Sequence, residues 1–263
     1  MRYIAHKKAQ KLVDKINSNR NEYFFIHYSC ASFIDNPKGS SRITSIAIKS
    51  LRTGDASSFS IHLEAERKHM DLNTIEKDYD KLEKSMLLSF YAFLKDHSNN
   101  CKYIHWNMRD SNYGFDAINH RAKCLGINER KIITIISENK VNFAVLLKDY
   151  FGKDFIAHPQ MYNLVKKNNL YSKMFLSGQE EAEAFVKHEF SKLHQSTLKK
   201  VECFYQIFNL LCDGNLQTDA KRQDIYGGRI QYYFDSIGSK WYIKLFIWFI
   251  PIIIGIIVSI SLQ

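Results

Sequence analysis

The stretch that decides the fold runs from Tyr23 to Phe33 and has the sequence YFFIHYSCASF. It is rich in aromatic residues and is followed by the turn-forming residues Asn36, Pro37 and Gly39. Aromatic and apolar runs that end at such turn signals are typical of buried β-strands. We therefore predict a central strand of a sheet here.

Two further strands are predicted directly after this one. The segments Arg42–Leu51 (RITSIAIKSL) and Ser58–Leu63 (SFSIHL) are apolar or β-branched, and in the second the apolar residues alternate with polar ones. Such alternation indicates a sheet with one buried face. The sequence RTGD at Arg52–Asp55 suits a tight hairpin turn. Three antiparallel strands are therefore expected at the start of the sheet.

The rest of the chain alternates between helical and strand patterns. A capped helix from Asn73 or Thr74 to Asp96 is expected to cover the sheet, because its apolar residues recur on one face. This order predicts an α/β layered domain, a mixed sheet flanked by helices. The remaining predicted strands are Cys101–Asn107 and, at the edge, Ile132–Ile136, and the remaining predicted helices are Gly114–Leu125, Val141–Phe151, Pro159–Lys167, Gln179–Glu189 and Gln195–Cys212.

An uncharged run, LFIWFIPIIIGIIVSISL at Leu245–Leu262, is predicted to form a single transmembrane helix. A helix needs roughly 20 apolar residues to cross a bilayer, and Trp241 and Tyr242 extend the run to that length. The basic residues before it favour a cytoplasmic location for everything that precedes the tail. The alternative is a buried core helix. The residues that mark the predicted transmembrane span are Leu245, Ile250, Pro251, Gly255 and Leu262, and the basic residues before it are Arg229, Lys240 and Lys244.

Charge and cysteine usage add two constraints. The net charge of +10 and the pI near 9.2 favour a polyanionic neighbour, either nucleic acid or the anionic inner leaflet of a membrane. Five scattered cysteines without a C-x-x-C pair indicate reduced thiols rather than a disulfide framework or a zinc site. The predicted organisation is a basic amphipathic helix at residues 1–22, an α/β domain at 23–215, a juxtamembrane connector at 216–240 and a transmembrane helix at 241–263.

Three later segments carry a resemblance to a known family. Tyr103–Asn107 (YIHWN) and Gly114–Ile118 (GFDAI) flank a loop, and Leu193–Lys199 (LHQSTLK) lies on a predicted late helix. In this order of elements they resemble the ribonuclease H-like fold of the proofreading-type DEDD 3′–5′ exonucleases. The first two segments resemble the family's second motif with a longer loop, the stretch Lys140–Leu170 resembles the lead-up to the third motif, and Leu193–Lys199 falls where that motif lies. The resemblance covers Tyr23–Asn215.

The resemblance implies a pair of divalent metal ions, Mg²⁺ or Mn²⁺, held by several carboxylates. This chain departs from that pattern, because Ser29-Cys30-Ala31 stands where the family has Asp-x-Glu. Lys199 stands where the third motif has aspartate, and Lys200 follows it. A lysine repels a metal ion that a carboxylate would hold, so we expect the family's mechanism to be lost. The alternative is a rearranged ligand set, for example Asp35, Glu64, Glu66 and Asp110.

The candidate site residues follow from the same comparison. The resemblance implies Asp116 and His194 as catalytic residues, and Asp116 or Asp110 as metal ligands. Each has a plain structural interpretation too, Asp116 as an early helix residue favoured by the helix dipole and His194 as an ordinary core or surface histidine. A pocket at the strand ends would hold a phosphate through neutral and basic residues. The predicted ligand-binding residues are Ser29, His105, Asn107, Arg109, Lys199 and Lys200.

Three functions compete on this evidence. The first is a tail-anchored protein whose exonuclease-like domain has lost its metal ligands and binds nucleic acid, a nucleotide or a protein partner. The second is an active metal-dependent nuclease with rearranged ligands, which needs Mg²⁺ or Mn²⁺. The third is a non-enzymatic membrane adaptor or effector, including a homo-oligomer formed through the tail.

Overall fold

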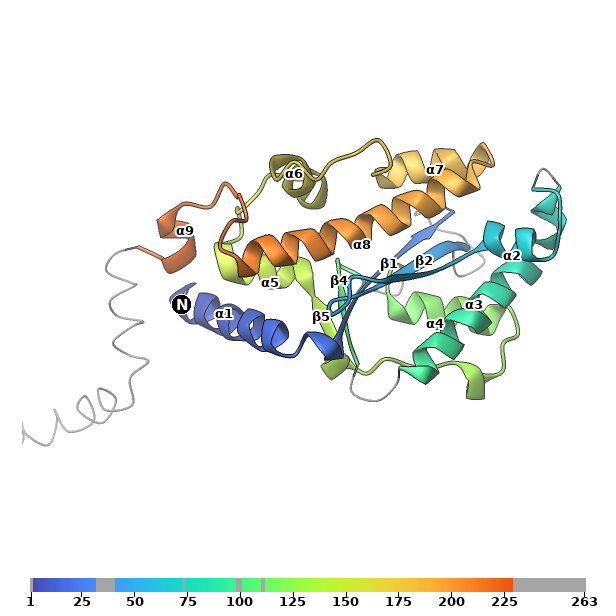
Figure 1. Ribbon diagram of the computed structural model, residues 1–263, viewed down its shortest axis with the longest axis horizontal. Helices are drawn as coiled ribbons and strands as arrows, with labels where there is room; N and C mark the ends of the chain where they lie inside the picture. The colour runs from blue at the N-terminus through green and yellow to red at the C-terminus, as the bar shows by residue number, and fades with distance from the viewer. Residues whose placement is uncertain (1, 32–40, 73, 98–100, 110–111, 229–263) are drawn as a thin grey trace, which may run out of the picture. The chain divides into compact units, whose positions relative to one another are not determined.

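The protein is a mixed α/β fold in which a five-stranded sheet is flanked by helices, as a computed structural model shows (Figure 1). The chain divides into two compact units, and the sheet belongs entirely to the second. Unit 1 comprises Met1–Val13, Leu147–Ala157 and Thr218–Gln263, and unit 2 comprises Asp14–Leu146 and His158–Gln217. The structure describes residues 2–31, 41–72, 74–97, 101–109 and 112–228.

The sheet is built around β1 (Tyr23–Cys30), the strand predicted to be central. Its strand order is β3-β2-β1-β4-β5. Within the first three strands, β1 pairs with β2 and β2 with β3 in antiparallel fashion, as predicted, whereas β4 is parallel to β1 and β5 is parallel to β4. The other strands are β2 (Ile43–Ser50), β3 (Ala56–Ser60), β4 (Lys102–His105) and β5 (Lys140–Asn142).

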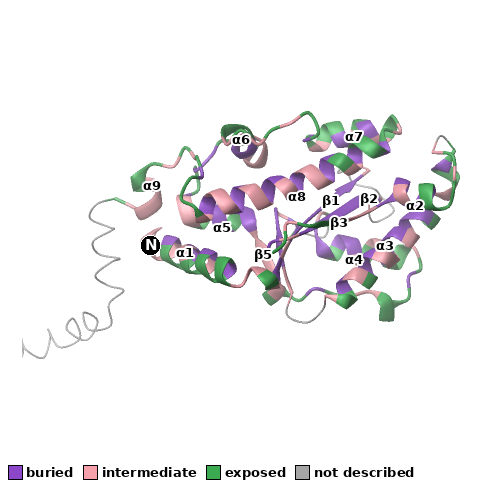
Figure 2. Cartoon of the chain, viewed as in Figure 1, coloured by how far each residue is buried: buried purple, intermediate pink, exposed green. Residues whose placement is uncertain are grey.

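Alternate side chains of β1 pack against helices on opposite faces of the sheet. Phe25 packs on α8 (Phe190–Cys212), with its ring 6.3 Å from Phe204. Phe24 packs on α3 (Tyr79–Asp96), with its ring 6.1 Å from Phe93. The buried side of α8 faces the strands, and α3 and α4 cover the other face (Figures 1 and 2). The sheet is therefore the middle layer of unit 2.

Most of the remaining helices have bounds close to those predicted, but the two short helices at Ile61–Arg67 and Arg222–Tyr226 were not predicted. The N-terminal amphipathic helix is confirmed as α1, and the capping box of α7 explains its sharp start, because Ser177 and Glu180 satisfy each other's backbone N–H groups. The helices besides α3 and α8 are α1 (Arg2–Ser18), α2 (Ile61–Arg67), α4 (Phe115–Cys124), α5 (Phe143–Phe151), α6 (Gln160–Lys167), α7 (Gly178–Val186) and α9 (Arg222–Tyr226).

Two predicted strands are wrong in part or in whole. The predicted strand Ser58–Leu63 ends at Ser60, because the Ser60 hydroxyl accepts the Leu63 N–H at 3.4 Å and caps helix α2. The predicted edge strand Ile132–Ile136 does not form, and the edge is β5 instead. Only Ile135 in that run is buried, so the apolar run marks a covering loop rather than a strand.

The predicted tail and connector lie mostly beyond the described residues. Within those residues, no helix is both long and apolar enough to cross a membrane. The predicted span, with Leu245, Ile250, Pro251, Gly255 and Leu262, falls outside them, as does the connector after Gly228. The tail therefore remains a prediction from the sequence.

Candidate functional site

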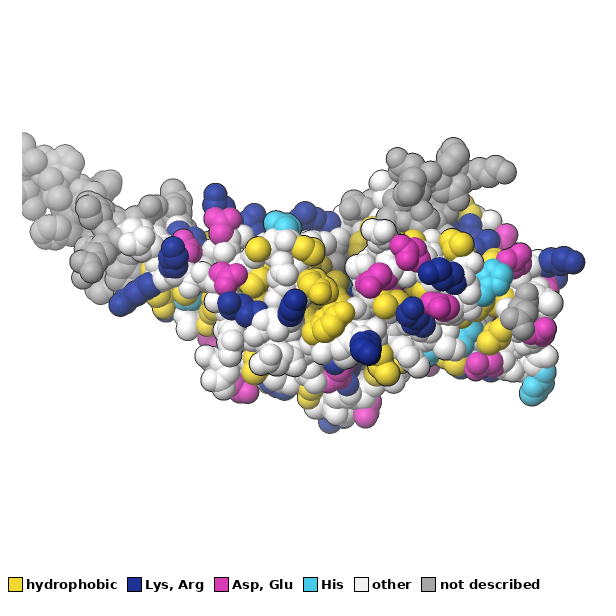
Figure 3. Space-filling model, turned by 90° about the horizontal axis from the view of Figure 1, so that it is seen from above, with side chains coloured by type: hydrophobic (Ala, Val, Ile, Leu, Met, Phe, Trp, Pro, Cys, Tyr) yellow, Lys and Arg dark blue, Asp and Glu magenta, His cyan; other side chains and the backbone are white. Residues whose placement is uncertain are grey.

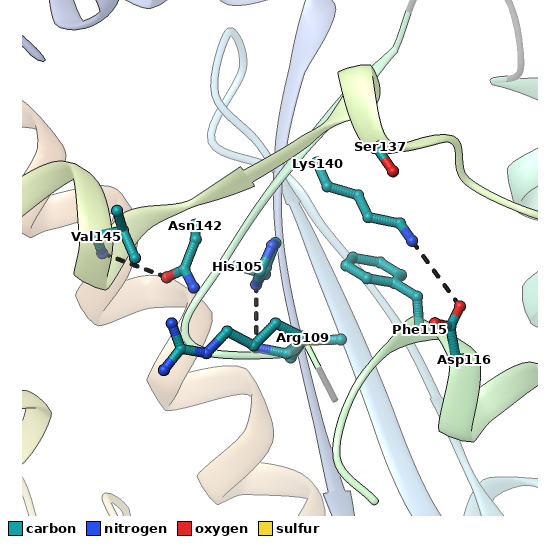
Figure 4. Close-up of a pocket in the computed structure, with 9 residues that line it drawn as sticks. His105, Arg109, Phe115, Asp116, Ser137, Lys140, Asn142 and Val145 are labelled. Carbon is teal, nitrogen blue, oxygen red and sulfur yellow. Dashed lines mark hydrogen bonds and ion pairs between the residues drawn. The ribbon is translucent and has the colours of Figure 1, made fainter. Parts of the chain in front are cut away.

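An open cleft of about 390 Å³ lies in unit 2 where β4 and β5 end and α4 begins (Figure 4). His105 is the last residue of β4, Asn142 is the last residue of β5, and Asp116 lies in the first turn of α4. Ligands of α/β proteins commonly bind at the carboxyl ends of parallel strands. The cleft is lined by His105, Met108, Arg109, Phe115, Asp116, Ser137, Lys140, Asn142 and Val145.

An amide pair fixes the two strand ends that frame this cleft. Asn107 has a φ of +54°, a left-handed conformation that asparagine tolerates better than most residues. The Asn142 side-chain amide donates to the Asn107 side-chain oxygen at 3.2 Å. In return, the Asn107 backbone N–H donates to the Asn142 side-chain oxygen at 3.4 Å. The chain therefore turns away from β4 at Asn107 and leaves the cleft open between the strands and α4.

The charges in the cleft favour an anion. The Lys140 ammonium lies 5.0 Å from the centre of the Phe115 ring and 4.0 Å from the Asp116 carboxylate. The Asp116 side chain is 75% exposed, whereas that of Lys140 is 22% exposed, so water screens the carboxylate more than the ammonium. Arg109 is exposed and adds a second cation. Two cations and one well-solvated carboxylate leave the cleft with a net positive charge.

His105 lines the cleft as a neutral hydrogen-bond donor. Its Nδ1 accepts the Met108 backbone N–H at 3.1 Å, which leaves the ring proton on Nε2. Burial, reinforced by Lys140 and Arg109, lowers the pKa of His105 to about 4. The Phe115 ring packs edge-on against it at 5.2 Å. At neutral pH this histidine therefore donates a hydrogen bond without carrying a charge.

A second polar cluster is buried on the opposite face of the sheet, between β1 and α8. The Lys200 ammonium of α8 lies 2.7 Å from the Glu181 carboxylate of α7, and the two side chains are only 4% and 1% exposed. Ser29 of β1 donates to the same carboxylate at 2.9 Å. We call this cluster the α8 network, and its members are Ser29, Ser45, Glu181, Ser196, Thr197 and Lys200.

The α8 network satisfies almost all of its own polar groups. Ser196 donates to Glu181 at 2.7 Å, and the Thr197 hydroxyl lies 2.8 Å from that of Ser29. The neighbouring His27 is the exception, because its buried Nε2 has no hydrogen-bond partner in the described part of the chain. Burial, together with the Lys200 charge, holds the pKa of His27 well below its usual value. A further ion could therefore bind in the network only if the Lys200–Glu181 ion pair broke.

The predicted site residues fall into three places. His105, Arg109 and Asp116 line the cleft, and Ser29 and Lys200 belong to the α8 network. His194 lies elsewhere on α8, where its Nε2 is 2.8 Å from the Ser58 hydroxyl and its ring is 5.0 Å from that of His62. Lys199 is half-buried beside the network without an ion pair in the described residues, Asn107 lies at the mouth of the cleft, and Asp110 lies outside the described residues.

No metal centre is assembled by the residues that the structure describes, since no group of three histidine, cysteine or acidic side chains is placed to hold an ion. Of the alternative ligand set, Asp35 and Asp110 are outside those residues. Glu64 is buried and is already bonded to Arg67 at 2.6 Å and to Ser85 at 2.8 Å. A metal site on Glu64 would therefore require both bonds to break.

Sequence reasoning missed Lys140, Asn142 and Glu181. The first two lie on a three-residue strand with no apolar pattern, and Glu181 lay in a helix identified only as acidic.

A further surface has no assigned partner: hydrophobic side chains gather in a patch among scattered lysines and arginines when the molecule is viewed from above (Figure 3). Tyr171 and Met174, in the loop before α7, are among the exposed hydrophobic residues, at 44% and 52%.

No family model matches the sequence, and no curated protein matches it.

Proposed function

We propose that this chain is a tail-anchored membrane protein whose unit 2 is a degenerate ribonuclease H-like domain, similar in plan to the DEDD exonucleases. In this proposal the domain binds a phosphate-bearing ligand without cleaving it. The ligand class is a nucleotide or the phosphorylated end of a nucleic acid. Support for the plan comes from the order β3-β2-β1-β4-β5, with a leading antiparallel hairpin pair, parallel β4 and β5, and a late helix across the first strand.

The proposed loss of hydrolysis is inferred from the buried lysine of the α8 network. In the family plan, carboxylates of the first strand and of the late helix face each other and hold two metal ions. The groups that face each other here are Ser29, Thr197 and Lys200, and the Lys200 ammonium already neutralises the nearby Glu181 carboxylate. A cation placed beside that ammonium would be repelled in a poorly solvated interior. The proposed domain therefore has an internal ion pair in place of a metal pair.

The cleft supplies the proposed phosphate contacts. Arg109 offers a planar fork of donors, Lys140 a point charge, and His105 a neutral donor on Nε2. Charge-assisted hydrogen bonds of this kind are the strong ones in phosphate recognition. The volume of about 390 Å³ lies within the usual range for small-ligand sites, roughly 300–1,000 Å³.

Binding and cleavage can be scored in one experiment on the full-length protein in mild detergent. The ligands are a fluorescent nucleoside triphosphate and short end-labelled DNA and RNA, each with and without Mn²⁺. We expect saturable binding without shortening of the strands. Arg109→Ala with Lys140→Ala should weaken binding about a hundredfold or more, because each of the two lost charge-assisted bonds is worth about 1.5–3 kcal/mol.

Lys68→Ala with Lys95→Ala is the matched control, since both lysines are exposed and neither lines the cleft. The control should bind as the unchanged protein does. Equal binding by the two double variants would remove the cleft from the proposal. Metal-dependent shortening that Asp116→Ala abolishes would establish an active nuclease instead.

A further inference from the structure

The part of helix α1 that belongs to unit 1, up to Val13, presents a basic surface. Lys7, Lys8 and Lys11 are exposed, whereas His6 and Ala9 are buried on the other side of the helix. Residues 2–13 contain no carboxylate, and the nearest one along the helix is the exposed Asp14, one turn beyond Lys11. We call Lys7, Lys8 and Lys11 the α1 lysine face. A helix with one buried side and a lysine-rich outer side is suited to an anionic surface.

The same helix is tied to the segment that leads toward the predicted tail. The Arg2 guanidinium donates to the Asp224 carbonyl of α9 at 2.6 Å, and also to the Asp149 carbonyl at the end of α5 at 2.6 Å. His6 donates to the Tyr150 carbonyl at 2.6 Å, and its ring lies 5.0 Å from that of Tyr226. These contacts all lie within unit 1. They hold α1 against α9, two residues before the described chain ends.

A glycine directly after α5 allows α9 to pack this closely. Gly152 has a φ of +111°, and a Cβ built there would lie 2.8 Å from the Asp224 carbonyl oxygen. A side chain at this position would push α9 away, because the clash is with backbone rather than with a flexible side chain. Glycine at 152 is therefore required for α9 to lie where Arg2 binds it.

The sequence limits how far this assembly can lie from a bilayer. Residues 229–240 separate Gly228 from Trp241, where the predicted span begins. A fully extended chain covers at most roughly 3.5 Å per residue, so this connector reaches roughly 40 Å at most. The connector and its flank add Arg229, Lys240 and Lys244 and only one acid, Asp235. A bilayer crossed by this tail would lie within reach of the α1 lysine face.

We propose that the α1 lysine face binds the headgroups of anionic phospholipids in the membrane that holds the tail. The inference rests on the proposed tail anchor. The charge complementarity and the attachment of α1 to α9 favour a lipid surface over nucleic acid, since the helix is fixed beside the chain's route into the bilayer. In this arrangement the lipid contact orients unit 1 against the membrane.

Lysine labelling of the full chain in nanodiscs tests this contact. One set of discs contains phosphatidylcholine alone, and the other contains about one-third phosphatidylserine. An amine-reactive reagent and mass spectrometry then report the labelling rate of each lysine. We expect the rates at Lys7, Lys8 and Lys11 to fall about threefold or more in the anionic discs and to recover at high salt. Lys68 and Lys187, exposed lysines of unit 2, serve as references and should not change.

A matched pair of variants separates the helix from bulk charge. Lys7→Gln/Lys8→Gln/Lys11→Gln should abolish the phosphatidylserine-dependent protection of residues 2–13 in hydrogen exchange, and Lys68→Gln/Lys95→Gln/Lys187→Gln should preserve it. Unchanged labelling between the two kinds of disc overturns the inference. Protection by an oligonucleotide but not by phosphatidylserine overturns it too, and assigns the face to nucleic acid.

Alkaline carbonate extraction of membranes that contain the chain tests the anchor separately. Release of the chain into the supernatant would remove the tail anchor and with it the inference. Retention of the chain with unchanged labelling would overturn the lipid contact alone and leave the tail anchor intact.

Discussion

The cleft and the α8 network contain the same kinds of groups but use them in opposite ways. In the cleft, the Lys140 ammonium lies 4.0 Å from Asp116, whose side chain is 75% exposed. In the network, the Lys200 ammonium lies 2.7 Å from Glu181, and both side chains are almost completely buried. A solvated, loosely paired lysine can still bind a ligand, whereas a buried, tightly paired lysine contributes only to the fold.

The two faces of the sheet therefore have different roles, one in stability and the other in ligand binding. Around the α8 network, His27 Nε2 is the one buried side-chain atom without a hydrogen-bond partner among the described residues, so binding of a ligand in this interior would require the fold to open. The cleft is open, and its donors do not depend on breaking a buried ion pair. Substitutions should therefore affect stability on one face and ligand binding on the other.

The largest effect is expected for Lys200→Met, which leaves the Glu181 carboxylate buried without its counter-ion. The free energy of unfolding should fall by about 3–5 kcal/mol. Lys140→Met in the cleft should cost about 0–1 kcal/mol, as exposed pairs do. Urea unfolding of the full-length protein, followed by tryptophan fluorescence, measures both. Lys200→Met/Glu181→Gln should recover most of the loss, because the neutral amide oxygen can still accept from Ser29 and Ser196. Equal losses for the two lysine variants would break the comparison.

A smaller effect is expected from acid, through the buried His105. Its folded pKa of about 4 lies below the ordinary value of about 6.5, so between these values only the unfolded chain binds the proton. Stability from this histidine is therefore complete above pH 6.5 and is lost as the pH falls toward 4. The loss at pH 5 is about 2 kcal/mol.

His105→Gln should remove that part of the pH dependence when unfolding is measured from pH 7 to pH 5. His27 titrates in the same direction and remains in the variant, so the slope should become shallower rather than flat. An unchanged slope would show that His105 is not held neutral in the folded protein.

The smallest effect is expected at the strand end that frames the cleft. Asn107→Ala should cost about 1–2 kcal/mol, because alanine is disfavoured at a φ of +54°. It also removes the side-chain oxygen that accepts from Asn142. Asn107→Gly keeps the conformation and loses only that bond. If binding of the fluorescent nucleotide weakens in both variants, the amide pair holds the cleft; if it weakens in neither, the cleft tolerates its loss.

The sequence predicted most elements whose signal is local. The aromatic and β-branched stretches of β1 and β2, and the amphipathic patterns of α1, α3 and α4, are visible within a few residues. The predicted start of α3 at Asn73 or Thr74 was too early, because a 3-10 turn at Ile75–Asp78 precedes the helix and Thr74 makes no capping hydrogen bond. One strand error occurred where a distant partner decides, and the other where a local cap was overlooked. The run Ile132–Ile136 has the composition of a strand, but β4 pairs instead with the polar residues Lys140–Asn142. Ile61–Leu63 alternates like a strand but follows a serine cap.

The candidate site was predictable to a similar extent. His105, Arg109 and Asp116 follow one strand in the sequence, so their common cleft could be expected. Lys140 reaches the same cleft only because β5 adds to the sheet beside β4, which no local pattern revealed. Lys199 was singled out as the basic residue at an acid position and Lys200 only as the lysine that follows it, whereas the partner of Lys200, Glu181, becomes apparent only when α7 and α8 pack together.

The long sequence separations in the α8 network bear on how the protein is made. Ser29 and Glu181 are 152 positions apart, and Ser45 and Thr197 are also 152 apart. During synthesis, β1 and β2 leave the ribosome long before α7 and α8. The Ser29 and Ser45 hydroxyl groups therefore cannot form these bonds until the two helices have been made. Bonds between such distant residues form slowly, because a long loop must close first. A nascent chain that ends before α7 and α8 therefore leaves the Ser29 and Ser45 hydroxyl groups to water, and the network can close only after both helices have been synthesised.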